Sequence, residues 1–161
     1  MRQSSEASIS SSEVPAHVAP PPRKLVLAKD HWQAMRTHVV ASLPYEACGL
    51  LAGADNEVRD VFPIANQLRS PVRYRMEPSE QVRAFAIIES KELELVGIYH
   101  SHTARPGTVG TMMAQPSATD IAEAAYAVVQ VLWSRIGGPW EANGYWIMDK
   151  LITKVALEIR D

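Results

Sequence analysis

Cysteine is nearly absent from the sequence, because Cys48 is the one cysteine among 161 residues. A single cysteine cannot form an intramolecular disulfide, and it argues against a structural zinc site, which usually has several cysteine ligands. Cys48 lies in an apolar stretch with no evident paired base, so we interpret it as a buried small side chain and not as a nucleophile. Because few thiols are typical of proteins of the reducing cytosol, we expect a cytoplasmic protein.

The sequence also lacks long apolar runs and an excess of basic residues. No apolar run approaches the roughly 18 residues that indicate a membrane-spanning helix, so we expect no membrane partner. Lys and Arg number 16 and Asp and Glu number 18, which gives a formal net charge of −2. Nucleic-acid-binding domains are usually basic, so we also expect no nucleic-acid partner. Nothing in the sequence indicates an oligomeric state.

The first 22 residues differ in composition from the rest of the chain. Six of the first twelve residues are serine, and prolines follow at positions 15, 20, 21 and 22. Such a segment cannot bury enough apolar surface to offset its ordering entropy, and it lacks the apolar stretch of a signal peptide. We therefore expect a disordered tail over 1–22 and one folded domain over 23–161.

Apolar periodicity predicts that helices and strands alternate along the folded part. Helices are expected over 30–42, 78–92 and 117–127, and strands over 25–27, 48–52, 57–64, 95–100, 128–133, 145–148 and 154–159. Asp30 is the expected cap of the first helix, and Val82, Phe85, Ala86 and Ile88 are the expected buried face of the second. Alternation of this kind indicates an α/β class with a mixed β-sheet flanked by helices.

Two histidines, His100 and His102, flank Ser101 at the end of a predicted apolar strand. Because strand side chains alternate between faces, His100 and His102 should point the same way, close enough to share one metal ion. A His-x-His pair arises readily by chance, so the pair alone is a weak motif.

The next acidic residue after His102 is Asp120, eighteen positions further along the chain. It ends the segment Ser117-Ala118-Thr119-Asp120, a pattern typical of a helix capping box, and taken alone this pattern favours a structural role for Ser117 and Asp120. The alternative is that Asp120 points from the first helical turn toward the two histidines. Two histidines and one carboxylate leave a fourth tetrahedral position for water, as in catalytic zinc sites.

Glu46 is a charged residue that leads directly into the predicted buried strand 48–52. A water molecule activated by zinc needs a general base, and a carboxylate at the start of a buried strand is a candidate because burying it unpaired is costly. Taken alone, a surface glutamate at a corner between helix and strand is the more ordinary interpretation.

Together, Glu46, the His100-Ser101-His102 segment and the Ser117-x-x-Asp120 segment resemble the JAMM signature of the MPN-plus zinc metalloproteases. The resemblance implies a single MPN-like domain with the cytidine-deaminase-like fold. It also implies one zinc ion per chain, bound by His100, His102 and Asp120. In the same family the residue at Glu46 activates the water, and the residue at Ser117 helps to stabilise the oxyanion.

Other segments are similar to the bacterial branch of this family that trims ubiquitin-like sulfur-carrier proteins. They are Tyr45–Gly49, the pattern Asn66…Arg69-Ser70-Pro71…Tyr74, and Tyr99–Ala104, in which Thr103 stands where family members usually have proline. This resemblance implies a zinc peptidase that hydrolyses the C-terminal tail or aminoacyl adduct of such a carrier and exposes its Gly-Gly end. The pathway stays open among cysteine biosynthesis, a thio-containing natural product and the removal of ubiquitin-like tags.

One departure from the family concerns the distance between the second histidine and the aspartate. The family usually places about eleven positions there, and this chain has 18. The additional residues fall in the predicted loop 105–115, which is either a flap over the cleft or an inert surface loop. The alternative functions are therefore an inactive MPN scaffold that binds partner proteins, and an isopeptidase that removes ubiquitin-like tags.

Four arginines, Arg69, Arg73, Arg75 and Arg83, lie close together in sequence and are countered by two glutamates, Glu77 and Glu80. We interpret this stretch as a solvated surface. The alternative is a docking patch for an acidic carrier protein.

Overall fold

The computed structural model describes residues 19–103, 114–135 and 137–161. Their elements, in chain order, are β1 (Lys24–Ala28), α1 (Lys29–Ser42), β2 (Cys48–Ala54), β3 (Glu57–Ile64), α2 (Pro78–Ser90), β4 (Glu94–Ser101), α3 (Ala118–Glu123), β5 (Val129–Arg135), β6 (Trp140–Met148) and β7 (Leu151–Arg160). The predicted alternation of helices and strands is confirmed, and every predicted strand is present.

The strands form one mixed sheet in the order β1-β3-β2-β4-β5-β6-β7, and the sheet closes on itself into a barrel. Strands β4 and β5 are parallel, and β1 runs parallel to both β3 and β7. The remaining neighbours are antiparallel. The predicted α/β class with a mixed sheet is therefore confirmed, and the closure through β1 and β7 is a feature that the sequence pattern did not predict.

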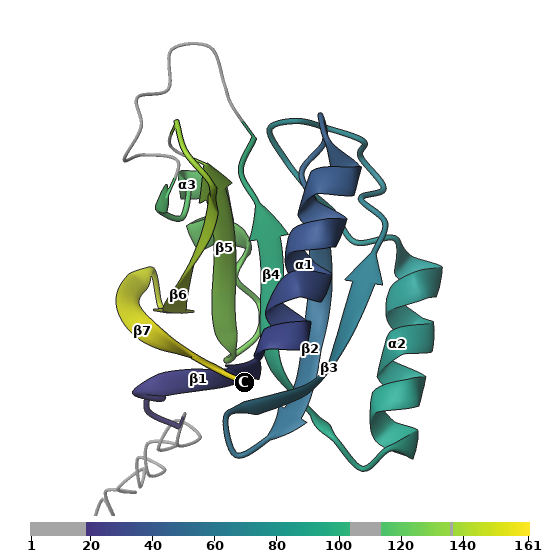
Figure 1. The fold of residues 1–161 in the computed structure, drawn as a ribbon, viewed down its shortest axis with the longest axis vertical. Helices are drawn as coiled ribbons and strands as arrows, with labels where there is room; N and C mark the ends of the chain where they lie inside the picture. The colour runs from purple at the N-terminus through teal and green to yellow at the C-terminus, as the bar shows by residue number, and fades with distance from the viewer. Residues whose placement is uncertain (1–18, 104–113, 136) are drawn as a thin grey trace, which may run out of the picture.

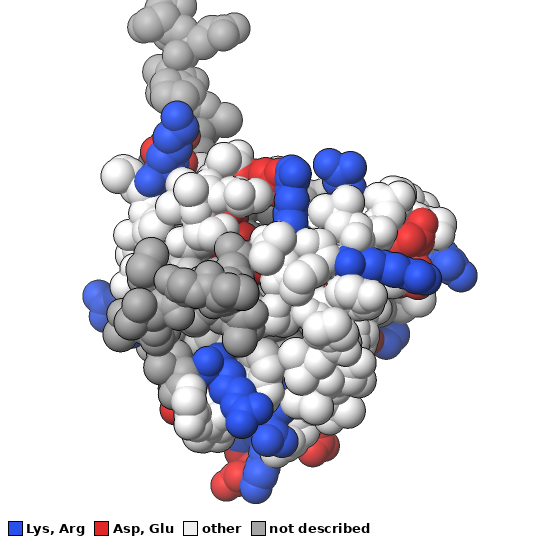
Figure 2. Space-filling model, turned by 90° about the horizontal axis from the view of Figure 1, so that it is seen from above, with Lys and Arg blue, Asp and Glu red and all other residues white. Residues whose placement is uncertain are grey.

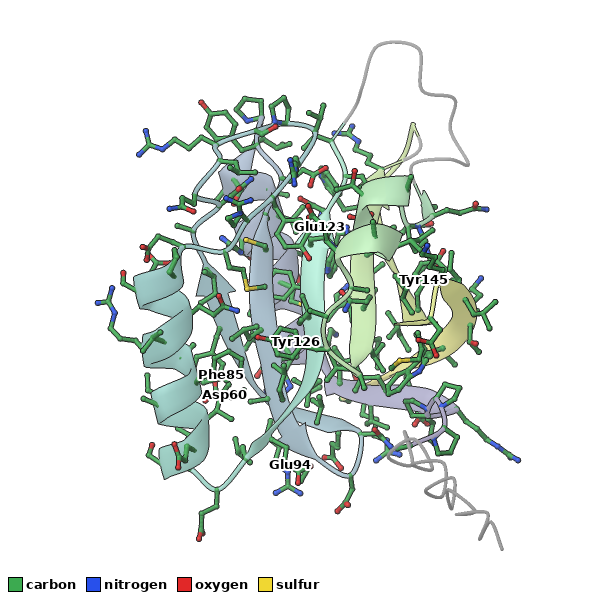
Figure 3. All side chains as sticks on the ribbon, turned by 180° about the vertical axis from the view of Figure 1, so that it is seen from behind. Asp60, Phe85, Glu94, Glu123, Tyr126 and Tyr145 are labelled. Atoms are coloured by element: carbon green, nitrogen blue, oxygen red, sulfur yellow. The ribbon has the colours of Figure 1, made fainter. Side chains whose placement is uncertain are left out.

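The helices lie on opposite faces of the sheet (Figures 1 and 3). Helix α1 packs its buried residues Met35 and Val39 into one apolar cluster, which also holds residues of β1, β5, β6 and β7. Helix α2 packs Ala84 and Ile88 into a second cluster on the other face, and α3 contributes to a third. Because β2 is covered on both faces, its sequence reads as a continuous apolar run.

Helix α1 is anchored to β4, the strand that carries the two histidines. His38 Nδ1 and the Tyr99 hydroxyl lie 2.7 Å apart, within hydrogen-bond distance. The Tyr99 ring passes so close to β2 that a Cβ atom at Gly49 would lie 2.3 Å from Tyr99 Cε1. Only glycine allows that approach, so the apolar run of β2 is interrupted at Gly49 for a packing reason.

Three details of the predicted helices are wrong. Helix α1 begins after Ala28, which makes no side-chain cap, and Asp30 lies in the first turn. In α2 the buried residues are Ala84 and Ile88, whereas Val82 and Ala86 are exposed. Ala84 and Ile88 are four positions apart, so they lie on the same face of the helix, and this face packs against the sheet. Helix α3 ends at Glu123 instead of continuing to 127.

Parts of two predictions lie outside the described residues. They are residues 1–18 of the predicted tail and most of the predicted loop 105–115. Among the described residues, no helix is long and apolar enough to cross a membrane.

Candidate metal centre and active site

The end of β4 carries both histidines to the same place. The Ser101 side chain between them points the other way, where its Oγ accepts a hydrogen bond of 2.8 Å from the Ala47 N–H. The His102 N–H donates to the Trp133 carbonyl at 2.8 Å and so continues the pairing of β4 with β5. The alternation of strand side chains therefore directs His100 and His102 toward α3, as predicted.

Asp120 reaches the histidines from the first turn of α3. Its Oδ2 atom lies 3.0 Å from His102 Nε2 and 3.3 Å from His100 Nε2. The same oxygen accepts a hydrogen bond of 2.8 Å from the Ser117 N–H, and Ser117 Oγ accepts one of 3.1 Å from the Asp120 N–H. The capping box is thus present. The capping box fixes the orientation of the Asp120 carboxylate, which faces the histidines. Asp120 can therefore cap the helix and face a metal site at the same time, so the two interpretations of the Ser117–Asp120 segment are compatible.

The donor atoms of these three residues fit a zinc ion. One ligand atom from each of His100, His102 and Asp120 lies within 4.8 Å of the others. A tetrahedral ion bound at about 2.0–2.1 Å separates neighbouring ligand atoms by about 3.3 Å, close to the two distances from Asp120 Oδ2. The His100 side chain is 3% exposed, and within the described part of the chain its Nδ1 atom has no hydrogen-bond partner, while its Nε2 atom approaches Asp120 Oδ2 without hydrogen-bond geometry. A buried imidazole that makes no well-formed hydrogen bond is explained by a metal ion that one nitrogen binds.

The electrostatics keep Asp120 ionised, which is the form that binds a metal. Burial alone would raise the pKa of Asp120. The close approach of the His100 and His102 imidazoles and the hydrogen bond from the Ser117 N–H outweigh burial and hold that pKa well below its ordinary value. A carboxylate that needs no deprotonation at neutral pH binds a cation without competition from protons.

Glu46 lies two residues before β2 and is only 1% exposed. Its N–H donates to the Ser70 carbonyl at 2.9 Å, and its carbonyl accepts from Asn66 Nδ2 at 3.1 Å. In the antiparallel register the last pair is Cys48 with His100, and extending this register by two residues would set Glu46 across from His102. Residues opposite each other in an antiparallel pair share a face, so this register predicts that Glu46 lies on the face with the histidines, and its charge does act on Cys48 and Tyr74.

Cys48 is fully buried, as predicted, and its Sγ lies 3.5 Å from the Ile64 carbonyl oxygen. Burial raises the pKa of its thiol to about 12, and the nearby charge of Glu46 acts in the same direction. A thiol with this pKa is not a nucleophile at neutral pH.

Tyr74 is a residue of the site to which the sequence assigned no role. Its ring stacks on the His100 ring with centroids 4.8 Å apart and planes at 27°. Burial and then the charge of Asp120 raise the pKa of Tyr74 above its ordinary value, so the phenol stays neutral. The irregular segment that carries Tyr74 is tied down by an Arg73–Glu123 ion pair and by a 2.6 Å hydrogen bond from Thr103 Oγ1 to the Pro71 carbonyl. The place of Tyr74 in the motif shared with the sulfur-carrier branch was the available signal.

A cavity of about 240 Å³ opens beside the three candidate ligands, and both His100 and Asp120 line it. Its other walls come from the segment 74–76, α2, β4, β5 and the chain after α3. Glu123 and Tyr126, labelled in Figure 3, are among these lining residues. The end of the molecule seen in Figure 2 carries several separate Lys and Arg side chains on a largely uncharged surface.

A sequence profile of the prokaryotic homologs of the JAB domain matches residues 28–148. The chain is 33% identical over 142 residues to the CysO-cysteine peptidase of Mycobacterium tuberculosis, a match that covers 84% of this chain and 90% of that protein. It is 41% identical over 81 residues to a desampylase of Pyrococcus furiosus, which covers 50% of this chain and 58% of the relative. The chain thus matches less than two thirds of that second protein.

The fold is also similar to that of a solved JAB1/MPN domain protein from Archaeoglobus fulgidus. The TM-score is 0.52 at 11% sequence identity, and the similarity covers 87% of this chain and 100% of that one. At this identity the similarity concerns the fold, and it agrees with the predicted MPN-like domain.

Proposed function

Because the chain belongs to the prokaryotic JAB family of JAMM zinc metallopeptidases, we propose that it trims the C-terminus of a small ubiquitin-like sulfur-carrier protein. The proposed reaction hydrolyses the amide bond that follows the Gly-Gly end of the carrier and releases the attached residue. The observation that carries the proposal is the meeting of two buried histidines and an ionised aspartate with distances that suit zinc.

In the proposed mechanism His100, His102 and Asp120 bind one zinc ion per chain. Zinc in such a site polarises the scissile carbonyl and makes a coordinated water more acidic. Glu46 accepts a proton from the attacking water and delivers it to the leaving amine. The water oxygen first bonds to the carbonyl carbon and an oxyanion develops; the carbon–nitrogen bond then breaks as the nitrogen takes the proton, so the products are a carboxylate and a free amine.

The hydroxyl of Ser117 keeps its hydrogen-bond donor available for this reaction. A hydroxyl has one donor and two acceptor positions, and the capping bond from the Asp120 N–H uses an acceptor position. The Ser117 O–H can therefore donate to the oxyanion that develops on the substrate while the cap stays intact. Such a donor stabilises a transition state by several kcal/mol, about 3–4 when it is removed from other enzymes.

The relative from Mycobacterium tuberculosis supports the choice of substrate, since its name denotes a peptidase that acts on a CysO–cysteine conjugate. An extended Gly-Gly tail has little bulk and suits a narrow approach to the metal centre, where it can pair with a strand edge. Removal of ubiquitin-like tags is the second candidate, favoured by the desampylase match.

The test compares the wild-type protein with Glu46→Gln, using the CysO–cysteine conjugate as substrate. We expect the wild type to release cysteine and Glu46→Gln to bind zinc equally well, with turnover lowered by about 10²–10⁴-fold. Metal content is measured by inductively coupled plasma mass spectrometry and cysteine by its thiol. A zinc-loaded Glu46→Gln protein with wild-type turnover would contradict the assigned base, and a zinc-loaded wild type that leaves the conjugate intact would contradict the substrate.

A further inference from the structure

We infer that the cavity beside His100 and Asp120 binds the residue that is released from the substrate, and that Arg75 and Gln130 recognise its free α-carboxylate. The inference rests on the proposed function and narrows it to the removal of a single C-terminal residue. The inference concerns the residue that follows the scissile bond, whereas the Gly-Gly tail precedes that bond.

The size and position of the cavity suit one residue. Its volume is about 240 Å³, below the roughly 300–1,000 Å³ of pockets that hold drug-sized ligands. A Gly-Gly tail has no side chains that could fill such a space. The residue on the other side of the scissile bond does have a side chain, and it starts next to the metal ligands that form part of the wall.

The charges that remain available in the wall favour an anion. Asp120 is already engaged by the two histidines, and the Glu123 carboxylate is engaged in an ion pair with Arg73. Arg75 also lines the cavity, and among residues 19–103, 114–135 and 137–161 its guanidinium forms no ion pair. The unpaired charge beside the cavity is thus positive, and a planar guanidinium binds a carboxylate through two parallel hydrogen bonds.

Gln130 is a second polar residue of the cavity wall that can contact a ligand. It lies on β5, lines the cavity and is only 7% exposed. Within the described part of the chain its side-chain amide makes no hydrogen bond. The amide is therefore accessible from the cavity and can pair with a ligand that enters it. The amide N–H₂ is a donor that a carboxylate oxygen accepts.

This chemistry separates two classes of substrate. A single residue at the C-terminus of a carrier presents a free carboxylate within one residue of the scissile bond. In an isopeptide bond the leaving group is a lysine side chain whose backbone continues into a protein on both sides, so no carboxylate is presented there. The cavity therefore favours C-terminal trimming over the removal of tags from lysine.

The experiment measures kcat/KM for two forms of the carrier conjugate of the preceding section, one ending in a free carboxylate and one ending in a primary amide. We expect the wild type to prefer the acid by about tenfold or more, since one charge-assisted hydrogen-bonded pair is at stake. Arg75→Gln should lower kcat/KM for the acid more than for the amide, so that the ratio of the two values falls to about one. Arg75→Lys should retain part of the preference.

Arg69→Gln is the matched control, because Arg69 is exposed on the same segment but does not line the cavity. It should keep the full preference for the acid. Equal cleavage of acid and amide by the wild type, or an unchanged preference in Arg75→Gln, would overturn the inference and leave the proposed function standing. Cleavage of neither form by the zinc-loaded wild type would overturn the proposed function and the inference with it.

Discussion

Substitutions of Ser117 can distinguish a structural role of its hydroxyl from a catalytic role. Alanine and glycine both remove the hydroxyl, but they destabilise the helix by different amounts. Ser117 caps α3 through the hydrogen bond from the Asp120 N–H. Alanine at such a cap costs about 1 kcal/mol, whereas glycine costs only a few tenths. For a domain of about 150 residues, 1 kcal/mol corresponds to a decrease of about 2–4 °C in Tm.

The expected results for Ser117→Ala and Ser117→Gly therefore differ in stability and agree in activity. Ser117→Ala should lower Tm by about 2–4 °C and Ser117→Gly by less than 1 °C. Both should lower kcat by about 10²–10³-fold, the usual consequence of removing one oxyanion donor. Ser117→Thr retains a hydroxyl and a good cap, so it should retain most of the activity.

The assays are thermal unfolding by circular dichroism, zinc content, and turnover of the carrier conjugate under saturating substrate. Zinc content decides whether a loss of turnover reflects a displaced Asp120 or a missing donor. A zinc-loaded Ser117→Gly protein with turnover within threefold of the wild type would refute the catalytic role. In that case Ser117 serves only to orient the carboxylate of Asp120.

Two further predictions concern the metal and the thiol. We expect the wild type to bind about one zinc ion per chain and His102→Ala to lose it. The control variant His31→Ala, on α1, should retain the zinc. Equal zinc content in the two variants, measured by mass spectrometry, would contradict the assignment of His102. Cys48 should resist thiol reagents at pH 8 in the folded protein and react in denaturant. The reason is that a pKa of about 12 leaves a thiolate fraction of only about 10⁻⁴ at that pH. Rapid labelling of the native protein, followed by absorbance, would show that Cys48 is accessible to solvent and contradict its burial in β2.

Much of the candidate site follows from local rules in the sequence. The alternation of strand side chains predicted that His100 and His102 share a face, and their common approach to Asp120 agrees with this. The capping pattern predicted both the start of α3 and the position of Asp120 in its first turn. These features depend on residues within four positions of one another, which is the range over which a sequence pattern determines geometry.

Features that depend on distant parts of the chain could not be predicted in this way. The alanine-rich run after Glu123 has a high helix propensity, yet the helix ends at Glu123 and the chain bends over 126–128 because it must turn into β5. The stacking of Tyr74 on His100 joins an irregular segment to a strand, and no periodicity marks such a contact. The pairing of β1 with β7 joins the two ends of the folded domain, so no local pattern could have predicted the closed barrel.

The spacing of 18 positions between His102 and Asp120 shows why a longer connection need not disturb the metal centre. His102 is held by its pairing with Trp133, and Asp120 is held by the cap with Ser117. Each side of the gap is thus fixed by contacts outside it, and extending a loop by about seven residues costs under about 1 kcal/mol of closure entropy. We therefore expect that deleting seven residues within 104–113 leaves zinc bound at the wild-type stoichiometry. Loss of zinc in a folded deletion variant would show that the connection itself positions Asp120.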